Sequence, residues 1–128
     1  MLAHCRRGYP LEACGVLLGR GREVRRVVPV PNRERERPRV RYAIDPRDLV
    51  RIDRKARASD CEIVGYFHSH PDHPARPSET DRQRAADSLS DGVFHIVVGV
   101  CGGERATPTA WVFRDATRCF EAEPLEQE

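Results

Sequence analysis

Residues 63–81 read IVGYFHSHPDHPARPSETD, an apolar run followed by the pattern H-x-H-x7-S-x2-D. The apolar run is typical of a buried strand. Side chains alternate along an extended segment, so His68 and His70 are expected to point to the same side. Two imidazoles on one face can share a metal ion, and Asp81 adds a third ligand if the intervening loop folds back. Two nitrogens and one carboxylate oxygen, with a fourth position open, suit a catalytic zinc site. This stretch therefore predicts a zinc hydrolase.

The whole chain has the size and composition of one globular domain. It has 128 residues, of which 39% are hydrophobic and 33% charged, so we expect a single domain over residues 1–128. The acidic residues 121–128 are expected to fray. No apolar run is long enough to cross a bilayer and the N-terminus lacks a signal-peptide pattern, so a cytoplasmic location is expected.

The cysteines and charges indicate the state of the thiols and the character of the surface. The five cysteines are scattered without a C-x-x-C pair, and four of them lie among apolar residues, which predicts buried reduced thiols rather than disulfides or a second metal site. Residues 1–60 carry a formal charge of +8 and residues 61–128 a charge of −6. A basic flank of this kind either steers an acidic partner or is a solvated arginine-rich surface. The cysteines are Cys5, Cys14, Cys61, Cys101 and Cys119.

The order of expected elements predicts an α+β fold. Asp45 suits a helix N-cap and Pro46 the first helical position, and segment 32–38, charged and bounded by prolines, is expected to be a mobile loop. Strands outnumber helices, which predicts a mixed β-sheet with flanking helices, an α/β/α sandwich. Strands are expected at 13–18, 23–31, 40–44, 61–67, 93–100, 110–113 and 117–120, and helices at 1–9, 46–59 and 79–88.

Each candidate site residue also has a purely structural interpretation. Ser78 and Asp81 have the spacing of a helix capping box, although a capped Asp81 still reaches a metal at that helix end. Glu12, before the first strand, has the position of an exposed strand-end charge. The other three histidines, His4, His73 and His95, are expected to be satisfied core or surface residues.

Taken together, these residues resemble the JAMM (MPN+) metalloproteases. The resemblance rests on Glu12 within PLEACG (residues 10–15), on GYFHSHP (residues 65–71) and on Ser78-x-x-Asp81. It covers nearly the whole chain and fills every position of the motif, and the first two stretches resemble those of small prokaryotic members closely. One departure is the short segment before Glu12, where the family has a longer first helix.

The resemblance implies a cytidine-deaminase-like fold and a role for each site residue. It implies that His68, His70 and Asp81 bind one Zn²⁺ with water as the fourth ligand. It also implies that Glu12 acts as base and proton shuttle, that Ser78 donates to the oxyanion, and that Ser69 supports the site.

The resemblance further implies cleavage of a peptide or isopeptide bond at the C-terminus of a ubiquitin-like or sulfur-carrier protein of the ThiS/MoaD type, ending in Gly-Gly. No membrane partner is expected, nucleic acid is disfavoured, and a homodimer stays open. A base deaminase is excluded because its H-x-E and P-C-x-x-C signature is absent. The remaining alternatives are a non-catalytic MPN-type binding module and a DNA-repair-associated (RadC-type) relative, which normally has an added N-terminal helical segment.

Overall fold

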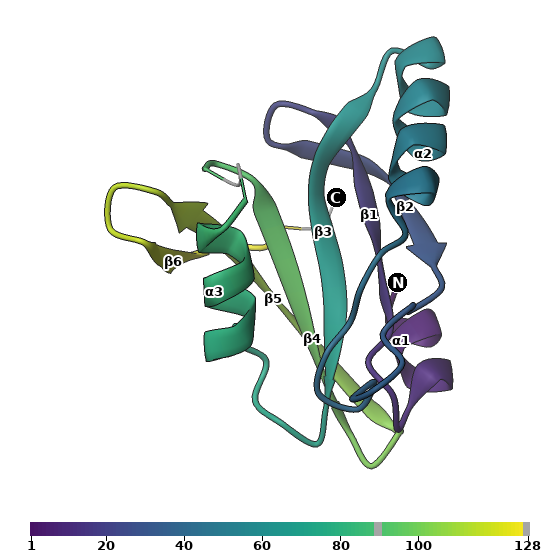
Figure 1. The fold of residues 1–128 in the computed structure, drawn as a ribbon, viewed down its shortest axis with the longest axis vertical. Helices are drawn as coiled ribbons and strands as arrows, with labels where there is room; N and C mark the ends of the chain where they lie inside the picture. The colour runs from purple at the N-terminus through teal and green to yellow at the C-terminus, as the bar shows by residue number, and fades with distance from the viewer. Residues whose placement is uncertain (89–90, 127–128) are drawn as a thin grey trace.

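The computed structural model describes residues 1–88 and 91–126. Within these residues, one six-stranded sheet carries three helices (Figure 1), which confirms the predicted α+β class. In chain order the elements are α1 (Leu2–Gly8), β1 (Cys14–Arg20), β2 (Glu23–Val30), α2 (Pro46–Ala58), β3 (Glu62–Pro71), α3 (Glu79–Ala86), β4 (Phe94–Cys101), β5 (Arg105–Arg114) and β6 (Cys119–Glu123).

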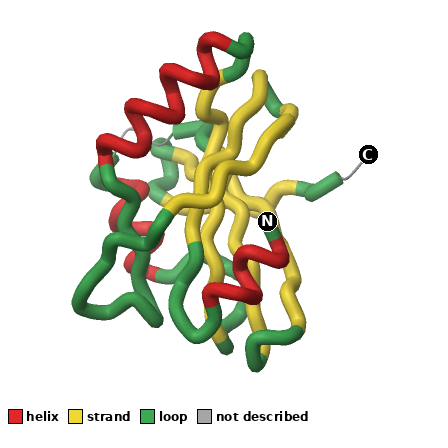
Figure 2. Tube along the Cα trace, turned by 90° about the vertical axis from the view of Figure 1, so that its right-hand side faces the viewer, coloured by secondary structure: helices red, strands yellow, loops and turns green. Residues whose placement is uncertain are grey.

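The sheet is mixed and has the strand order β2-β1-β3-β4-β5-β6. Strands β3 and β4 are parallel because the chain crosses over through α3 between them, and every other neighbouring pair is antiparallel. Figure 2 shows α1 on one side of the sheet and α2 and α3 on the other. The three layers are those of the predicted α/β/α sandwich.

Each face of the sheet has its own apolar core. Side chains such as Leu17 and Phe67 form a cluster that includes Cys5 of α1, whereas Val16 packs with Ile52 of α2 on the opposite face. Gly15 lies opposite Phe67 in the β1–β3 pairing, and a Cβ there would lie 2.1 Å from the Phe67 ring. Glycine at this position therefore lets the aromatic ring lie directly over β1.

The start of α2 agrees with the sequence prediction. The side chain of Asp45 accepts a hydrogen bond of 2.9 Å from the backbone N–H of Arg47, and Pro46 occupies the first turn. Ile52 and Ala56 are buried on the inner face of the helix. Asp45 is thus an N-cap that also fixes the end of the preceding loop.

The strand predicted at residues 40–44 is wrong, because other groups occupy its backbone. The carboxamide of Asn32 donates to the carbonyl of Arg41 and accepts from the N–H of Ala43, and the N–H of Arg33 donates to the Ala43 carbonyl. These bonds close a long loop over residues 31–45. The segment 32–38 is irregular as predicted, but its base is fixed by Asn32 rather than left unanchored.

Three further boundaries differ from the prediction. Strand β3 continues to Pro71 instead of ending at residue 67, and β5 begins at Arg105, five residues early. The tail does not fray from residue 121, since β6 extends to Glu123, whose carboxylate pairs with Arg22 and Arg114. Residues 127–128 of the predicted tail lie outside the described residues.

The thiols are free, as predicted, but only some are buried. Cys5 and Cys14 are buried and Cys61 is half-buried, whereas Cys101 and Cys119 at strand ends are exposed. The expectation that four of the thiols are buried is therefore wrong. Among residues 1–88 and 91–126, no helix is both long and apolar enough to cross a bilayer.

Candidate metal centre

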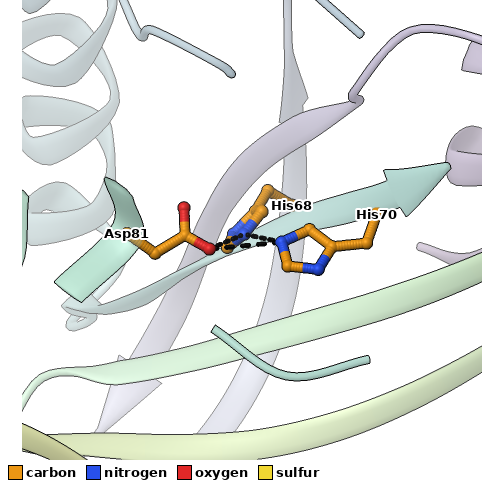
Figure 3. A group of neighbouring side chains, drawn as sticks. All are labelled: His68, His70 and Asp81. Carbon is orange, nitrogen blue, oxygen red and sulfur yellow. Dashed lines mark hydrogen bonds and ion pairs between the residues drawn. The ribbon is translucent and has the colours of Figure 1, made fainter. Parts of the chain in front are cut away.

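Strand β3 and helix α3 bring three side chains to one point. Residues two apart on a strand share a face, and His68 and His70 both project from β3 toward Asp81 in the first turn of α3 (Figure 3). The Nε2 atom of His68 lies 3.1 Å from Nε2 of His70 and 3.0 Å from Oδ2 of Asp81. The Nε2 atom of His70 lies 3.2 Å from the same Asp81 oxygen. The three atoms form a nearly equilateral triangle.

This triangle fits a zinc ion. A tetrahedral zinc with bonds of about 2.0–2.1 Å separates neighbouring ligand atoms by about 3.3 Å, close to the three observed edges of 3.0–3.2 Å. In addition, Nδ1 of His70 donates to the carbonyl of Pro74 at 2.9 Å. Because that nitrogen carries the hydrogen, the lone pair of Nε2 is left for a metal.

Burial and hydrogen bonds within the cluster shift the pKa values of its three side chains. Burial lowers the pKa of His68, which keeps its imidazole neutral. Burial raises the pKa of Asp81, but hydrogen bonds with His68 and His70 outweigh it and hold that pKa well below its usual range. Burial lowers the pKa of His70, but hydrogen bonds with Asp81 and with the Pro74 carbonyl outweigh it and raise that pKa. Zinc binds a neutral imidazole and an ionised carboxylate, so metal binding would displace a proton from His70.

Glu12 lies beside this cluster and is buried, not an exposed strand-end charge. In the β1–β3 pairing Cys14 is opposite His68, so continuing the register by two residues places Glu12 opposite His70, on the same face. Only 5% of Glu12 is exposed, and its Oε1 is buried without a hydrogen-bond partner among the described residues. Burial raises the pKa of Glu12 to about 8, with the charge of Asp81 adding to this effect.

Ser69 fixes the segment that carries Glu12. Its side chain points away from the metal cluster, and its Oγ accepts a hydrogen bond of 2.8 Å from the N–H of Ala13. Its own N–H donates to the Ala13 carbonyl at 2.9 Å. The residue after Glu12 is therefore tied to β3 by both groups.

Ser78 is the N-cap of α3, as its spacing predicts. Its Oγ accepts from the N–H of Asp81 at 3.1 Å, and its own N–H donates to Oδ2 of Asp81 at 2.8 Å. The capping box thus orients the carboxylate oxygen that faces the histidines. The hydroxyl hydrogen of Ser78 donates to none of the described residues.

Tyr42 completes the wall of the site and was not predicted. Its ring stacks on His68 with centroids 4.6 Å apart. The carbonyl of Tyr42 accepts a hydrogen bond from Arg84 of α3, and Arg84 also pairs with Glu34 at 3.6 Å. The only local signal was Pro31-Asn32, a dipeptide typical of turns, which could have indicated a loop folded onto the site.

The other histidines lie outside the ligand set, although two of them are not satisfied. His73 is exposed. His95 and His4 each hold a buried Nε2 without a hydrogen-bond partner among the described residues, so the expectation of satisfied side chains is wrong for both. Burial lowers the pKa of His95 to about 4.

Comparison with known proteins identifies the family that carries this arrangement. The profile of prokaryotic homologues of the JAB domain matches residues 1–114. The chain belongs to the prokaryotic JAB family. This JAB domain is 41% identical over 92 residues to a desampylase of Haloferax volcanii, which covers 67% of the chain and 66% of the relative. It is 36% identical over 87 residues to the CysO-cysteine peptidase of Mycobacterium tuberculosis, which covers 68% of the chain and 60% of the relative.

The aligned part of the JAB domain thus spans less than two thirds of the length of these relatives. A JAB1/MPN domain protein of Archaeoglobus fulgidus has a similar structure, with a TM-score of 0.60 and 20% sequence identity over 98% of this chain and 87% of that one. This similarity shows that the sheet and helices have the JAB/MPN fold.

Proposed function

We propose that this JAB domain is a zinc-dependent hydrolase that cleaves a peptide or isopeptide bond at the C-terminus of a ubiquitin-like or sulfur-carrier protein. The observation that carries this proposal is the convergence of His68, His70 and Asp81 within 3.0–3.2 Å of one another, beside the buried Glu12. Three ligands with an acid outside the ligand set are what zinc-assisted hydrolysis requires. A non-catalytic binding module has no need of this complete set.

His68, His70 and Asp81 would hold the zinc through Nε2, Nε2 and Oδ2. When bound, zinc polarises a carbonyl oxygen and lowers the pKa of water to about 7. Glu12 acts as the base: its carboxylate accepts a proton on the metal side of β1 and returns it to the leaving amine. Its surroundings exclude water, so the proton is held by Glu12 between the two transfers. The positive charge of the metal site favours the ionised form of Glu12 and draws its pKa down from the raised value.

Ser78 has a second function beyond capping α3. Its Oγ accepts from the helix backbone, so its O–H remains available to donate a hydrogen bond. The same helix end holds Asp81, which places this donor next to the ligand cluster. We assign Ser78 to stabilise the oxygen on which negative charge develops.

The names of two relatives support the substrate class. They are called desampylase and CysO-cysteine peptidase, names that describe removal of a group from a small modifier or carrier protein. For this chain we propose a carrier that ends in Gly-Gly, because glycines have no side chains to obstruct the approach of the scissile bond to a buried metal.

A cleavage assay tests the proposal. The zinc-loaded protein is incubated with a Gly-Gly carrier that is extended by one cysteine or joined to a lysine peptide by an isopeptide bond. The masses of the products are measured by intact-mass spectrometry. We expect release of the extension, with zinc retained but activity lost in Glu12→Gln, and both lost in His70→Ala. Full zinc content in His70→Ala would remove His70 from the ligand set. Loss of zinc in Glu12→Gln would make Glu12 a ligand instead of the base.

A further inference from the structure

The loop between β2 and α2 carries an unusual density of arginine. Residues 32–41, here called the arginine loop, contain an arginine at every odd position from Arg33 to Arg41. The even positions Asn32 and Glu34 are half-buried, whereas four of the five arginines are exposed. Asn32 and Glu34 are thus partly covered, whereas most of the guanidinium groups lie at the surface. The arginines are Arg33, Arg35, Arg37, Arg39 and Arg41.

These guanidinium groups have no carboxylate partners within the molecule. Among the described residues, ten of the sixteen arginines outside the loop form an ion pair, but none of the five in the loop does. Of the two carboxylates in the loop, Glu34 pairs with Arg84 of α3 instead, and Glu36 is exposed and forms no ion pair among the described residues. With five arginines against one exposed carboxylate, the loop presents a net positive charge that no ion pair among the described residues neutralises.

The arginine loop is also anchored to the catalytic centre. The carbonyl of Pro38 accepts from the N–H of Glu12 at 2.8 Å, and Asn32 donates to the carbonyl of Glu12 at 2.9 Å. Tyr42, directly after the loop, stacks on the metal ligand His68. In Figure 1 the loop runs beside β3 down toward α1, along the strand that supplies both histidines.

Because the tail of a carrier is short, the folded part of the carrier must contact the protein surface around the metal site. An extended chain spans about 3.3–3.6 Å per residue, so a Gly-Gly tail reaches only about 7 Å. A carrier whose scissile bond lies at the zinc must therefore rest its folded body against the surface around the site. A preorganised loop adds little ordering cost to that contact.

We propose that the arginine loop is the docking surface for an acidic face of the carrier protein, an inference that rests on the proposed hydrolase function. The net positive charge of the arginine loop accelerates encounter with an acidic partner and disfavours neutral or basic partners. Nucleic acid fits less well, because single-stranded chains need exposed aromatic platforms, and the ring of Tyr42, directly after the loop, is stacked on His68.

The test compares two triple variants that lower the net charge equally. The loop variant changes Arg35, Arg37 and Arg39 to alanine. The control variant changes Arg26, Arg54 and Lys55 to alanine; these are exposed and form no ion pair among the described residues. Each is assayed on two substrates: an acidic Gly-Gly carrier extended by cysteine, and a short peptide of that carrier's last residues with the same extension.

For the loop variant we expect KM for the carrier to rise about tenfold or more with kcat unchanged, because the loop charges act on the encounter rate. The dependence of KM on salt concentration should become weaker for the same reason. Peptide cleavage should be unchanged, and the control variant should behave as the wild type on both substrates. Equal behaviour of the two variants on the carrier would overturn the docking surface while leaving the hydrolase intact.

Binding separates this inference from the proposed function. Affinity for the carrier is measured in the Glu12→Gln background, with and without the loop substitutions, so that no cleavage is needed. Binding that depends on the loop without any cleavage by the wild type refutes the hydrolase but supports the docking surface. No binding of the carrier, or loop-dependent binding of a single-stranded oligonucleotide alone, refutes the docking proposal.

Discussion

At the level of single residues, the role of Ser78 as a helix cap and its proposed role as an oxyanion donor predict effects of different size. Loss of an N-cap costs about 1 kcal/mol of stability, whereas loss of an oxyanion donor lowers turnover by on the order of 10²–10³. For Ser78→Ala we expect zinc to be retained, the melting temperature to fall modestly and kcat to fall by about two orders of magnitude. Thermal unfolding and steady-state kinetics on the same preparation measure both.

Asp45 provides the matched control for Ser78. It caps α2 by accepting from the N–H of Arg47 and lies outside the proposed catalytic group. Asp45→Ala should lose similar stability and keep its kcat. If both variants retain normal kcat, Ser78 is a helix cap and no more.

Glu12 makes the stability of the metal-free protein depend on pH. Its folded pKa of about 8 lies above the ordinary value of 4.5, so the folded state binds a proton that the unfolded state releases between these two values. By linkage, the contribution of Glu12 to stability is present below pH 4.5 and is lost as pH rises toward 8. We expect Glu12→Gln to stabilise the metal-free protein increasingly over that range, measured by urea unfolding. A stability difference that is constant with pH would mean that Glu12 is not the buried acid described here.

At the level of elements, the sequence predicts what depends on local chemistry. The helix caps Asp45 and Ser78 and the alternation that puts His68 and His70 on one face are confirmed. The strand at 40–44 is wrong, because the groups that satisfy its backbone come from Asn32, nine or more residues earlier. Local propensity carries no information about that side chain.

The depth of Glu12 could not be read from the sequence for a similar reason. An isolated glutamate before a strand is normally exposed, and its burial here results from pairing with β3 and from the loop carbonyl of Pro38. Both partners are distant in the chain. Family resemblance singled out Glu12, whereas its environment emerged only from the assembled elements.

Ser69 provides a test of how the pairing of β1 with β3 supports catalysis. Ser69→Ala leaves the buried N–H of Ala13 without its 2.8 Å acceptor, which costs about 1–3 kcal/mol and loosens the segment of Glu12. We expect zinc to be retained and kcat to fall. Because Ser69 acts through Glu12, adding Ser69→Ala to Glu12→Gln should cause no further loss of activity. An additive loss in the double variant would show that Ser69 acts independently.

At the level of the whole molecule, a metal bound by His68, His70 and Asp81 would link α3 to a sheet to which this helix is otherwise weakly joined. Helix α3 buries only Ala85 within the described structure, whereas α2 buries Ile52 and Ala56. Apolar burial therefore contributes little to holding α3 on the sheet. The candidate ligands span this junction, with two on β3 and one on α3.

Removal of the metal should consequently destabilise the protein and loosen α3 in particular. A ligand at about 100 times its Kd stabilises the folded state by about 2.7 kcal/mol. At roughly 4 °C per kcal/mol for a domain of this size, chelation should lower Tm by about 10 °C.

Hydrogen exchange should accelerate in residues 79–86 more than in α2, because α2 keeps its own apolar contacts with the sheet. His70→Ala serves as the control and should show neither response, since it has no complete site to empty. An equal Tm shift in His70→Ala would mean that the chelator acts on the protein without removing a metal from this site. Equal acceleration of exchange in α2 and α3 would mean that the metal stabilises the whole fold and does not tether α3 in particular.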